Sequence, residues 1–145
     1  MQLISQTNEF YVIDKPPFMA VEPPSHQSTL RDWMIENGYI KPTDWKDSER
    51  FGVVHRIDAD TSGIVIWAKN PMTQARLKLL WQGRAIKKTY TALLIGECQK
   101  EGVIELPIMR DNKNDKQKVS FLNEPNARAA ITEYKKLKVC QIENI

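Results

Sequence analysis

The alternation of apolar runs and turn-forming residues predicts several strands. Residues 10–13 are aromatic or β-branched and run into a polar turn with two prolines, which predicts a short strand ending in that turn. Residues 64–68 are apolar at successive positions, a pattern typical of a strand covered on both faces. Residues 89–95 predict another strand, which ends at Gly96. Further strands are expected near 102–106, 117–122 and 128–139, with a polar hairpin from Arg110 to Lys118.

Helix-capping residues mark a short first helix. Thr29 stands as an N-cap, and Asp32 three residues later can complete a capping box. Apolar residues follow at helical spacing, and Gly38 lies where a C-terminal cap belongs. These signals predict an amphipathic helix over residues 30–37. Residues 40–51 are polar without a period and predict a loop.

A second helix is expected after Asn70-Pro71, because asparagine caps helices and proline suits the first helical position. Gly83 would end this helix after about 12 residues. Ala75, Leu79 and Leu80 are expected to face inward from it. The mixed order of strands and helices predicts an α+β fold, with a mixed, largely antiparallel sheet and a few short helices.

Length and composition are those of one globular domain, residues 1–145, with 41% apolar and 27% charged residues. The longest uncharged, mainly apolar run, residues 61–68, is far shorter than the roughly 20 residues that cross a bilayer. The first residues lack the basic start and apolar core of an export signal. Two cysteines and two histidines form no metal-binding motif. We expect a cytoplasmic protein without a membrane span or a metal.

The net charge of +3 is unevenly distributed. Residues 1–72 carry seven Lys/Arg against ten Asp/Glu, whereas residues 73–145 carry fourteen against eight. A basic half favours a ligand with a phosphate backbone. A solvated basic face would give the same distribution, so charge alone does not identify a partner.

The densest group of reactive side chains lies between two apolar segments. Residues 55–62 read His-Arg-Ile-Asp-Ala-Asp-Thr-Ser and precede the apolar run at 64–68. Loops held by rigid strands can present reactive groups with their polar atoms accessible. Gly63 permits a positive φ or a close backbone approach. Thr61 and Ser62 can hydrogen-bond a carboxylate and fix its rotamer.

Three interpretations of this turn remain open from the residues alone. It can be a polar turn capped by its own side chains. It can be a divalent-metal site that uses Asp58 and Asp60, although no further acidic ligand follows in an obvious motif. It can hold a nucleophilic or acid–base carboxylate, with Arg56 nearby to contact phosphate. The spacing does not choose among them.

A resemblance to a known protein family distinguishes among these three interpretations. Residues 55–63, His-Arg-Ile-Asp-Ala-Asp-Thr-Ser-Gly, resemble the His-Arg-Leu-Asp-x-x-Thr-Ser-Gly signature of RluA-type RNA pseudouridine synthases, with isoleucine for leucine. Residues 11–17 are similar to the family's early strand, which ends in Asn/Asp-Lys-Pro. Residues 87–96 match its Lys-x-Tyr-x-Ala-Leu-x-x-Gly strand, and residues 130–134 match its Ala-x-Thr-x-Tyr strand. These four elements occur in order and cover roughly residues 9–137.

The resemblance implies the fold of the pseudouridine synthase catalytic domain, C-terminally incomplete, and it implies a reaction. Such enzymes cut the C1′–N1 bond of a uridine in RNA, rotate the base and rejoin it through C5, without cofactor or metal. Asp58 would be the essential carboxylate, which either adds to C1′ of the ribose or abstracts the C2′ proton. Tyr90 would be the active-site tyrosine that stacks on the base; without the resemblance it is equally a core aromatic.

The implied partner is ribosomal or transfer RNA. A target uridine inside folded RNA must be flipped out, at a cost of about a few kcal/mol. Arg56 would fill or brace the vacated space, and His55 would either contact phosphate or serve a hydrogen-bonded structural role. The RNA-contacting set that follows is Arg56, His55, Thr61, Ser62 and Lys87. Other basic residues that can line the RNA path or remain solvated are Arg76, Lys78, Arg84 and Lys88.

One family element is not found. The family continues with a strand pair that carries Thr-Gly-Arg-x-His-Gln-Ile-Arg, whose arginine pairs with the catalytic aspartate, and no Gly-Arg-x-His occurs in this sequence. We also expect no separate accessory RNA-binding domain. The expectation is therefore a fragment, a shortened product, or a homodimer that covers the open edge of the strand at 128–139. The alternative to an active enzyme is an inactive RNA-binding module.

Overall fold

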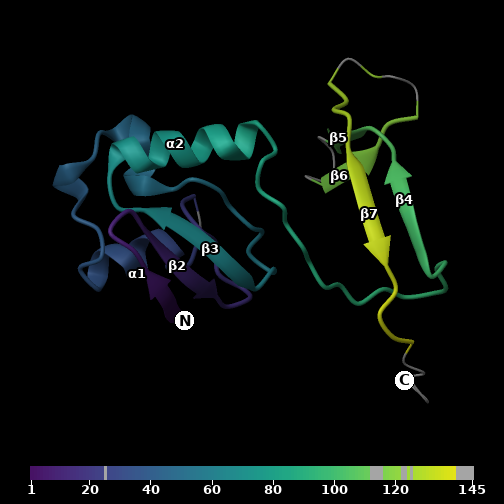
Figure 1. Cartoon of the computed structure of the whole chain (residues 1–145), viewed down its shortest axis with the longest axis horizontal. Helices are drawn as coiled ribbons and strands as arrows, with labels where there is room; N and C mark the ends of the chain where they lie inside the picture. The colour runs from purple at the N-terminus through teal and green to yellow at the C-terminus, as the bar shows by residue number, and fades with distance from the viewer. Residues whose placement is uncertain (25, 112–115, 122–123, 125, 140–145) are drawn as a thin grey trace. The chain divides into compact units, whose positions relative to one another are not determined.

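The computed structural model describes residues 1–24, 26–111, 116–121, 124 and 126–139. The chain divides into two compact units, Met1–Tyr90 and Thr91–Ile145 (Figure 1). In the described residues, the first unit contains the α-helices and a three-stranded sheet, and the second contains two two-stranded sheets. This combination of short helices and antiparallel strands confirms the predicted α+β class.

The first unit has its strands adjacent in space although helices separate two of them along the chain. Its sheet has the order β1-β2-β3, and both neighbouring pairs are antiparallel. The 3-10 helices η1 and η2 occupy the segment for which the sequence predicts a loop. In chain order the elements are β1 (Gln2–Gln6), β2 (Phe10–Lys15), α1 (Leu30–Glu36), η1 (Pro42–Asp44), η2 (Asp47–Gly52), β3 (Gly63–Ala68) and α2 (Pro71–Gln82).

The pleat of β2 places a lysine on the core face of the sheet. Tyr11, Ile13 and Lys15 alternate along β2, so they share one face. Ile13 lies opposite Val65 of β3, and Lys15 lies opposite Gly63. The buried apolar cluster consists of Ile13, Val21, Leu30, Met34, Ile40, Val53, Val65 and Trp67. The site described below is built on the end of this face.

Helix α1 begins as the sequence predicts. The Thr29 hydroxyl accepts a hydrogen bond from the Asp32 N–H at 3.3 Å, and the Asp32 carboxylate accepts one from the Thr29 N–H at 2.9 Å. This capping box satisfies two donors that the first helical turn leaves free. Gly38 follows the end of α1 with a φ of 72°, a left-handed value that favours glycine.

Helix α2 has the predicted bounds but a different orientation about its axis. Asn70 caps it and Gly83 ends it. Its buried residues are Thr73 and Gln74, and the Gln74 amide donates to the Val53 carbonyl at 2.9 Å. The expected inward stripe of Ala75, Leu79 and Leu80 is wrong, because all three are exposed. A hydrogen bond to the preceding segment, and not the apolar period, orients this helix.

None of the helices in the described ranges is long and apolar enough to cross a membrane.

A left-handed run of three residues leads into the candidate site. Arg50, Phe51 and Gly52 have φ values of 51°, 50° and 93°. At Gly52 a Cβ atom would lie only 2.5 Å from the Ala68 carbonyl oxygen, so glycine is required by contact as well as by φ. A left-handed conformation costs a non-glycine residue about 1–2 kcal/mol. The Phe51 carbonyl offsets part of this cost by accepting a 2.6 Å hydrogen bond from the Trp67 indole N–H.

The described residues of the second unit form two antiparallel strand pairs. Strand β4 (Glu101–Glu105) pairs with β7 (Ile131–Lys135), and β5 (Ile108–Asp111) pairs with β6 (Lys116–Val119), all antiparallel. These strands confirm the expectations near 102–106, 117–122 and 128–139, although residues 112–115 of the predicted hairpin lie outside the described ranges. The buried apolar residues of the described chain all lie between Ile13 and Ala68. The second unit therefore buries little apolar surface by itself.

Two strand predictions need correction. The strand expected at 89–95 does not form; the segment is irregular, and Leu93, Leu94 and Ile95 are exposed. The residues have strand propensity, but a strand also needs a neighbour, and none of the described residues pairs with this segment. Strand β3 is covered on both faces only in part, because Ile64 is half exposed.

Candidate active site

The candidate site is a loop held at both ends by the sheet of the first unit. Val53 forms an antiparallel bridge with β3, and β3 itself begins directly after residues 54–62. Within the loop, the Thr61 N–H donates to the Asp58 carbonyl oxygen at 3.1 Å and closes a tight turn. Asp58 and Asp60 are both exposed. The loop thus presents carboxylates from a backbone of fixed course.

The Lys15 ammonium group binds this loop through a backbone carbonyl. Its side chain is fully buried, and its Nζ donates to the carbonyl oxygens of Pro16 at 2.9 Å, Met19 at 2.7 Å and Ala59 at 3.0 Å. The Met19 N–H also donates to the Ala59 carbonyl at 3.2 Å. The end of β2, the segment after it and the loop are therefore joined at one ammonium group, which has the three donors needed for this role.

The same ammonium acts electrostatically on the exposed carboxylates. Burial lowers the pKa of Lys15, while the charges of Asp60 and Asp58 act in the opposite direction. Lys15 is therefore close enough to both carboxylates for their charges to be felt. Among the described residues, the Asp58 carboxylate forms no salt bridge or side-chain hydrogen bond, so its oxygens remain available.

A pocket of about 260 Å³ opens beside the loop. Its lining brings together four of the residues that the sequence singles out, Arg56, Asp58, Thr61 and Tyr90, with Ile57 between them. The hydroxyl of Thr61 does not fix the Asp58 rotamer; its backbone N–H shapes the turn instead. An available carboxylate beside an aromatic ring can attack a carbon or accept a proton on a flat ligand that the ring stacks against.

Arg56 is oriented by a carboxylate that no sequence motif marks. Its Nη1 donates to Glu22 Oε1 at 2.7 Å. Arg50 also binds Glu22, with its Nε 2.7 Å from Oε2 and its Nη2 on Oε1. The Glu22 side chain is buried, whereas both guanidinium groups are substantially exposed. Arg56 therefore reaches the pocket from an anchored position.

His55 is directed into the fold. Its Nε2 accepts a hydrogen bond from the Ile66 N–H at 2.9 Å, and its ring stacks on Trp81 with centroids 4.4 Å apart. Burial, with a smaller effect of the Lys88 charge, lowers the pKa of His55 to about 4, so the imidazole is neutral at pH 7. This geometry favours the structural role, and a phosphate contact by His55 stays a prediction.

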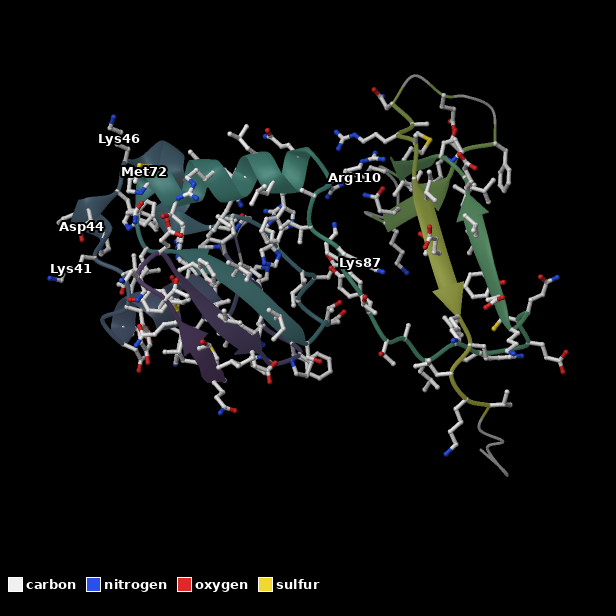
Figure 2. The ribbon with its side chains drawn as sticks, in the orientation of Figure 1. Lys41, Asp44, Lys46, Met72, Lys87 and Arg110 are labelled. Atoms are coloured by element: carbon white, nitrogen blue, oxygen red, sulfur yellow. The ribbon has the colours of Figure 1, made fainter. Side chains whose placement is uncertain are left out.

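Besides His55, two more predicted residues lie outside the pocket lining. Ser62 and Lys87 are both exposed, and Lys87 lies on the irregular chain that follows α2 (Figure 2). Their contacts with RNA stay predictions. Sequence reasoning had a signal for Lys15 in the Asp-Lys-Pro match. It had none for Glu22 or Arg50, which lie 28 residues apart in the chain and meet only in the folded unit.

An α+β domain that presents an unpaired aspartate, an arginine and a tyrosine at one pocket is a candidate carboxylate-dependent enzyme. Residues 9–144 match the family model described as RNA pseudouridylate synthase. This match covers more than nine tenths of the chain, and the chain belongs to that family.

Relatives agree with this assignment, and a solved structure shares the fold. The chain is 30% identical over 140 residues to the ribosomal large subunit pseudouridine synthase D of Pseudomonas aeruginosa, covering 95% of this chain and 42% of that protein. It is 31% identical over 140 residues to the protein of the same description from Buchnera aphidicola, covering 94% and 42%. The chain thus spans less than half the length of these relatives. The structure of human RNA pseudouridylate synthase domain containing 4 superposes with a TM-score of 0.57 at 18% identity, over 92% of this chain and 52% of that one, and shows the same fold.

Replacing Lys15 with methionine is expected to destabilise the first unit by about 3 kcal/mol, because the carbonyls of Pro16 and Met19 lose this donor and the Ala59 carbonyl keeps only the Met19 N–H. Urea unfolding followed by tryptophan fluorescence measures the loss. Lys69→Met is the matched control, because the Lys69 ammonium forms an exposed hydrogen bond with Gln6 and should contribute less than about 1 kcal/mol. Equal losses in the two variants would contradict the role assigned to Lys15.

The neutral His55 predicts a pH dependence of stability. The unfolded histidine has a pKa of about 6.5, and the folded one about 4, so the unfolded state binds the proton first as the pH falls. The contribution of His55 to the free energy of unfolding is fully present above pH 6.5 and is lost as the pH falls from about 6.5 to 4. We expect a loss of about 1–2 kcal/mol, because the partial exposure of the ring screens the effect. The lowered pKa of Asp32 acts only below this window. Urea unfolding at pH 7 and pH 5 should show the loss in the wild type and not in His55→Gln.

Proposed function

We propose that this protein converts a uridine in structured RNA to pseudouridine in the cytoplasm, with Asp58 as the essential carboxylate. The observation that carries the proposal is the pocket that brings Asp58, Tyr90 and Arg56 together. Membership of the RNA pseudouridylate synthase family supports the same reaction. The excess of positive over negative side chains in residues 73–145 favours binding of a polyanionic substrate.

Asp58 has two routes to this isomerisation. In the first, its oxygen bonds to C1′ of the ribose as the C1′–N1 bond breaks and the electron pair leaves with the uracil. The base then rotates, C5 bonds to C1′ as the Asp58 ester bond breaks, and the C5 proton is lost to a base while N1 takes up a proton. In the second, Asp58 removes the C2′ proton as the C1′–N1 bond breaks and the electron pair leaves with the uracil, which gives a glycal. C5 of the rotated base then bonds to C1′ as Asp58 returns the proton to C2′, and C5 again loses its proton while N1 gains one. Both routes need an accessible, ionised carboxylate, and the exposed Asp58 supplies an accessible one.

Tyr90 and Arg56 have roles that follow from the flipped base. The Tyr90 ring at the pocket wall can stack on the uracil during its rotation, and the tyrosine can assist in removing the C5 proton. Arg56 extends from its anchor on Glu22 to the pocket, where it can occupy or brace the space that the uridine leaves. Contacts by Thr61, Ser62 and Lys87 complete the proposed RNA surface, whereas His55 keeps the structural role that its geometry favours.

Large-subunit ribosomal RNA is the substrate that the relatives favour. The proteins from Pseudomonas aeruginosa and Buchnera aphidicola are described as acting on the ribosomal large subunit. This chain spans 42% of each of these relatives. We therefore propose the same substrate for this chain.

An RNA-binding module without catalysis is the second candidate. The absence of a salt bridge to Asp58 in the described residues favours it, because a catalytic aspartate is expected to pair with an arginine in this family. Lys15 is a cation near Asp58, but it is buried beneath the loop. RNA binding with a steep salt dependence and no isomerisation would identify this second function.

Asp58→Asn is expected to lower pseudouridine formation at least about a thousandfold, because it removes the reacting oxygen. The protein is incubated with large-subunit ribosomal RNA transcribed with unmodified uridine, and pseudouridine is mapped by carbodiimide labelling and primer extension. Asp60→Asn is the matched control, because Asp60 is exposed on the same turn and does not line the pocket. It should retain activity within about threefold. If the wild type and Asp58→Asn behave alike, catalysis by this chain is excluded.

We further propose that the chain forms the homodimer predicted above, in which a second copy covers the open edge of the sheet formed by β4 and β7 together with the exposed apolar face of that sheet. Val103 of β4 and Ile131 of β7 are both more than half exposed, and a two-stranded sheet alone is marginally stable in water. Light scattering after size exclusion should give twice the mass of one chain. Ile131→Lys should give a monomer, whereas Gln117→Lys on β6 should not. A wild-type monomer throughout a dilution series would refute the homodimer.

A further inference from the structure

A buried carboxylate in the first unit is shared by two arginines. Glu22 Oε2 accepts from Arg50 Nε at 2.7 Å, and Glu22 Oε1 accepts from Arg56 Nη1 at 2.7 Å and also contacts Arg50 Nη2. The three charges sum to +1. Among the described residues, no second carboxylate pairs with either guanidinium. Among the side chains that the structure describes, the cluster therefore carries one excess positive charge.

The positive side of this cluster faces solvent. The Glu22 side chain is 6% exposed, whereas those of Arg50 and Arg56 are 45% and 60% exposed. Both guanidinium groups bind the carboxylate of Glu22, so they lie close enough to repel each other, and burial and the charge of Arg56 lower the pKa of Arg50. An anion placed between or over them would relieve that repulsion and accept their remaining N–H groups.

The backbone at Arg50 is strained in the conformation that places its side chain on Glu22. Arg50 and Phe51 are both left-handed, and Arg50 is fixed by two contacts with Glu22. Arg56 lies six residues later, and it lines the pocket with Asp58. Glu22 uses Nε and Nη2 of Arg50 and Nη1 of Arg56, so N–H groups on Nη1 of Arg50 and on Nε and Nη2 of Arg56 can still donate to phosphate oxygens.

We propose that Arg50 and Arg56, anchored together on Glu22, form a binding site for the RNA phosphodiester backbone next to the uridine in the pocket. The site adds Arg50 and Glu22 to the RNA-binding machinery, which the sequence had limited to the residues of the loop and the segment at Lys87. The identification of the anion as RNA rests on the proposed function. Glu22 is a positioning residue, because it acts through the two arginines.

A purely structural ion cluster is the competing explanation. In that case the pair of arginines would only neutralise Glu22, and removing either would lower the stability of the first unit without changing how the folded protein binds a polyanion. Affinity and its salt dependence, measured on folded protein, distinguish the two explanations because only a phosphate contact releases counterions from RNA.

The test measures binding of fluorescein-labelled oligouridylate of 20 nucleotides by anisotropy over a series of KCl concentrations. Each contact with single-stranded nucleic acid contributes a slope of about 0.7 in log affinity against log salt, which amounts to about fivefold between 1 M and 0.1 M salt. Arg50→Gln and Arg56→Gln should each weaken binding about fivefold at 0.1 M and lower the slope by about 0.7, and the double variant should lose about 25-fold.

Lys41→Gln is the matched control, because it also removes one exposed cation of the first unit. Lys41 lies on the side of that unit away from Lys87 (Figure 2), outside the pocket lining. Its slope should equal that of the wild type. Far-ultraviolet circular dichroism verifies folding. If Arg50→Gln does not fold, Arg50→Lys replaces it, and loss of the planar fork should weaken binding at least about threefold.

Slopes and affinities of the arginine variants equal to those of Lys41→Gln would overturn the proposal, as would an absence of oligouridylate binding by the wild type. The outcome is separate from that of the proposed function, since binding does not need turnover. If the arginine variants lose affinity while no pseudouridine forms, the phosphate site stands and the isomerase function fails. If pseudouridine forms while the arginine variants bind RNA as the control does, the phosphate site fails and the isomerase function stands.

Discussion

The ammonium group of Lys15 is the interaction on which the candidate site depends. It donates to Pro16, Met19 and Ala59, and so joins the end of β2 to the segment after it and to the loop that carries Asp58. A fully buried ammonium is costly unless its donors are satisfied. Three carbonyl acceptors satisfy it, and the nearby charges of Asp58 and Asp60 oppose the effect of burial on its pKa. The loop is therefore fixed through its backbone, which leaves its carboxylates to face solvent.

The rest of the site follows the same division between buried anchors and exposed reactive groups. Glu22 is buried and presents Arg50 and Arg56. His55 is neutral, hydrogen-bonded to β3 and stacked on α2, so it holds the loop beside Asp58 without adding a charge to it. Anchoring by buried polar groups is effective because each is strongly directional in a low-dielectric environment.

The two units contribute unequally to this arrangement. The first unit contains the buried apolar cluster, the anchors and the whole lining of the pocket. The described part of the second unit consists of paired strands whose apolar side chains are mainly exposed. The chain belongs to the RNA pseudouridylate synthase family and spans 42% of two of its relatives. Within this chain, the loop motif at residues 55–63 lies in the first unit, where the buried apolar cluster supports it.

The sequence by itself determined the local features: the α+β class, the capping box of α1, the bounds of α2, the strands β2 and β3, and the motif around Asp58. Each of these depends on neighbours along the chain, so spacing and residue type suffice. Only the tertiary structure decided which face α2 buries, that residues 89–95 have no strand partner, and that Lys15 and Glu22 anchor the site. These features depend on groups far apart in sequence, such as Lys15 with Ala59 and Glu22 with Arg50 and Arg56. A pattern along one segment cannot specify such contacts, because the hydrogen bonds form only when the sheet brings the partners together.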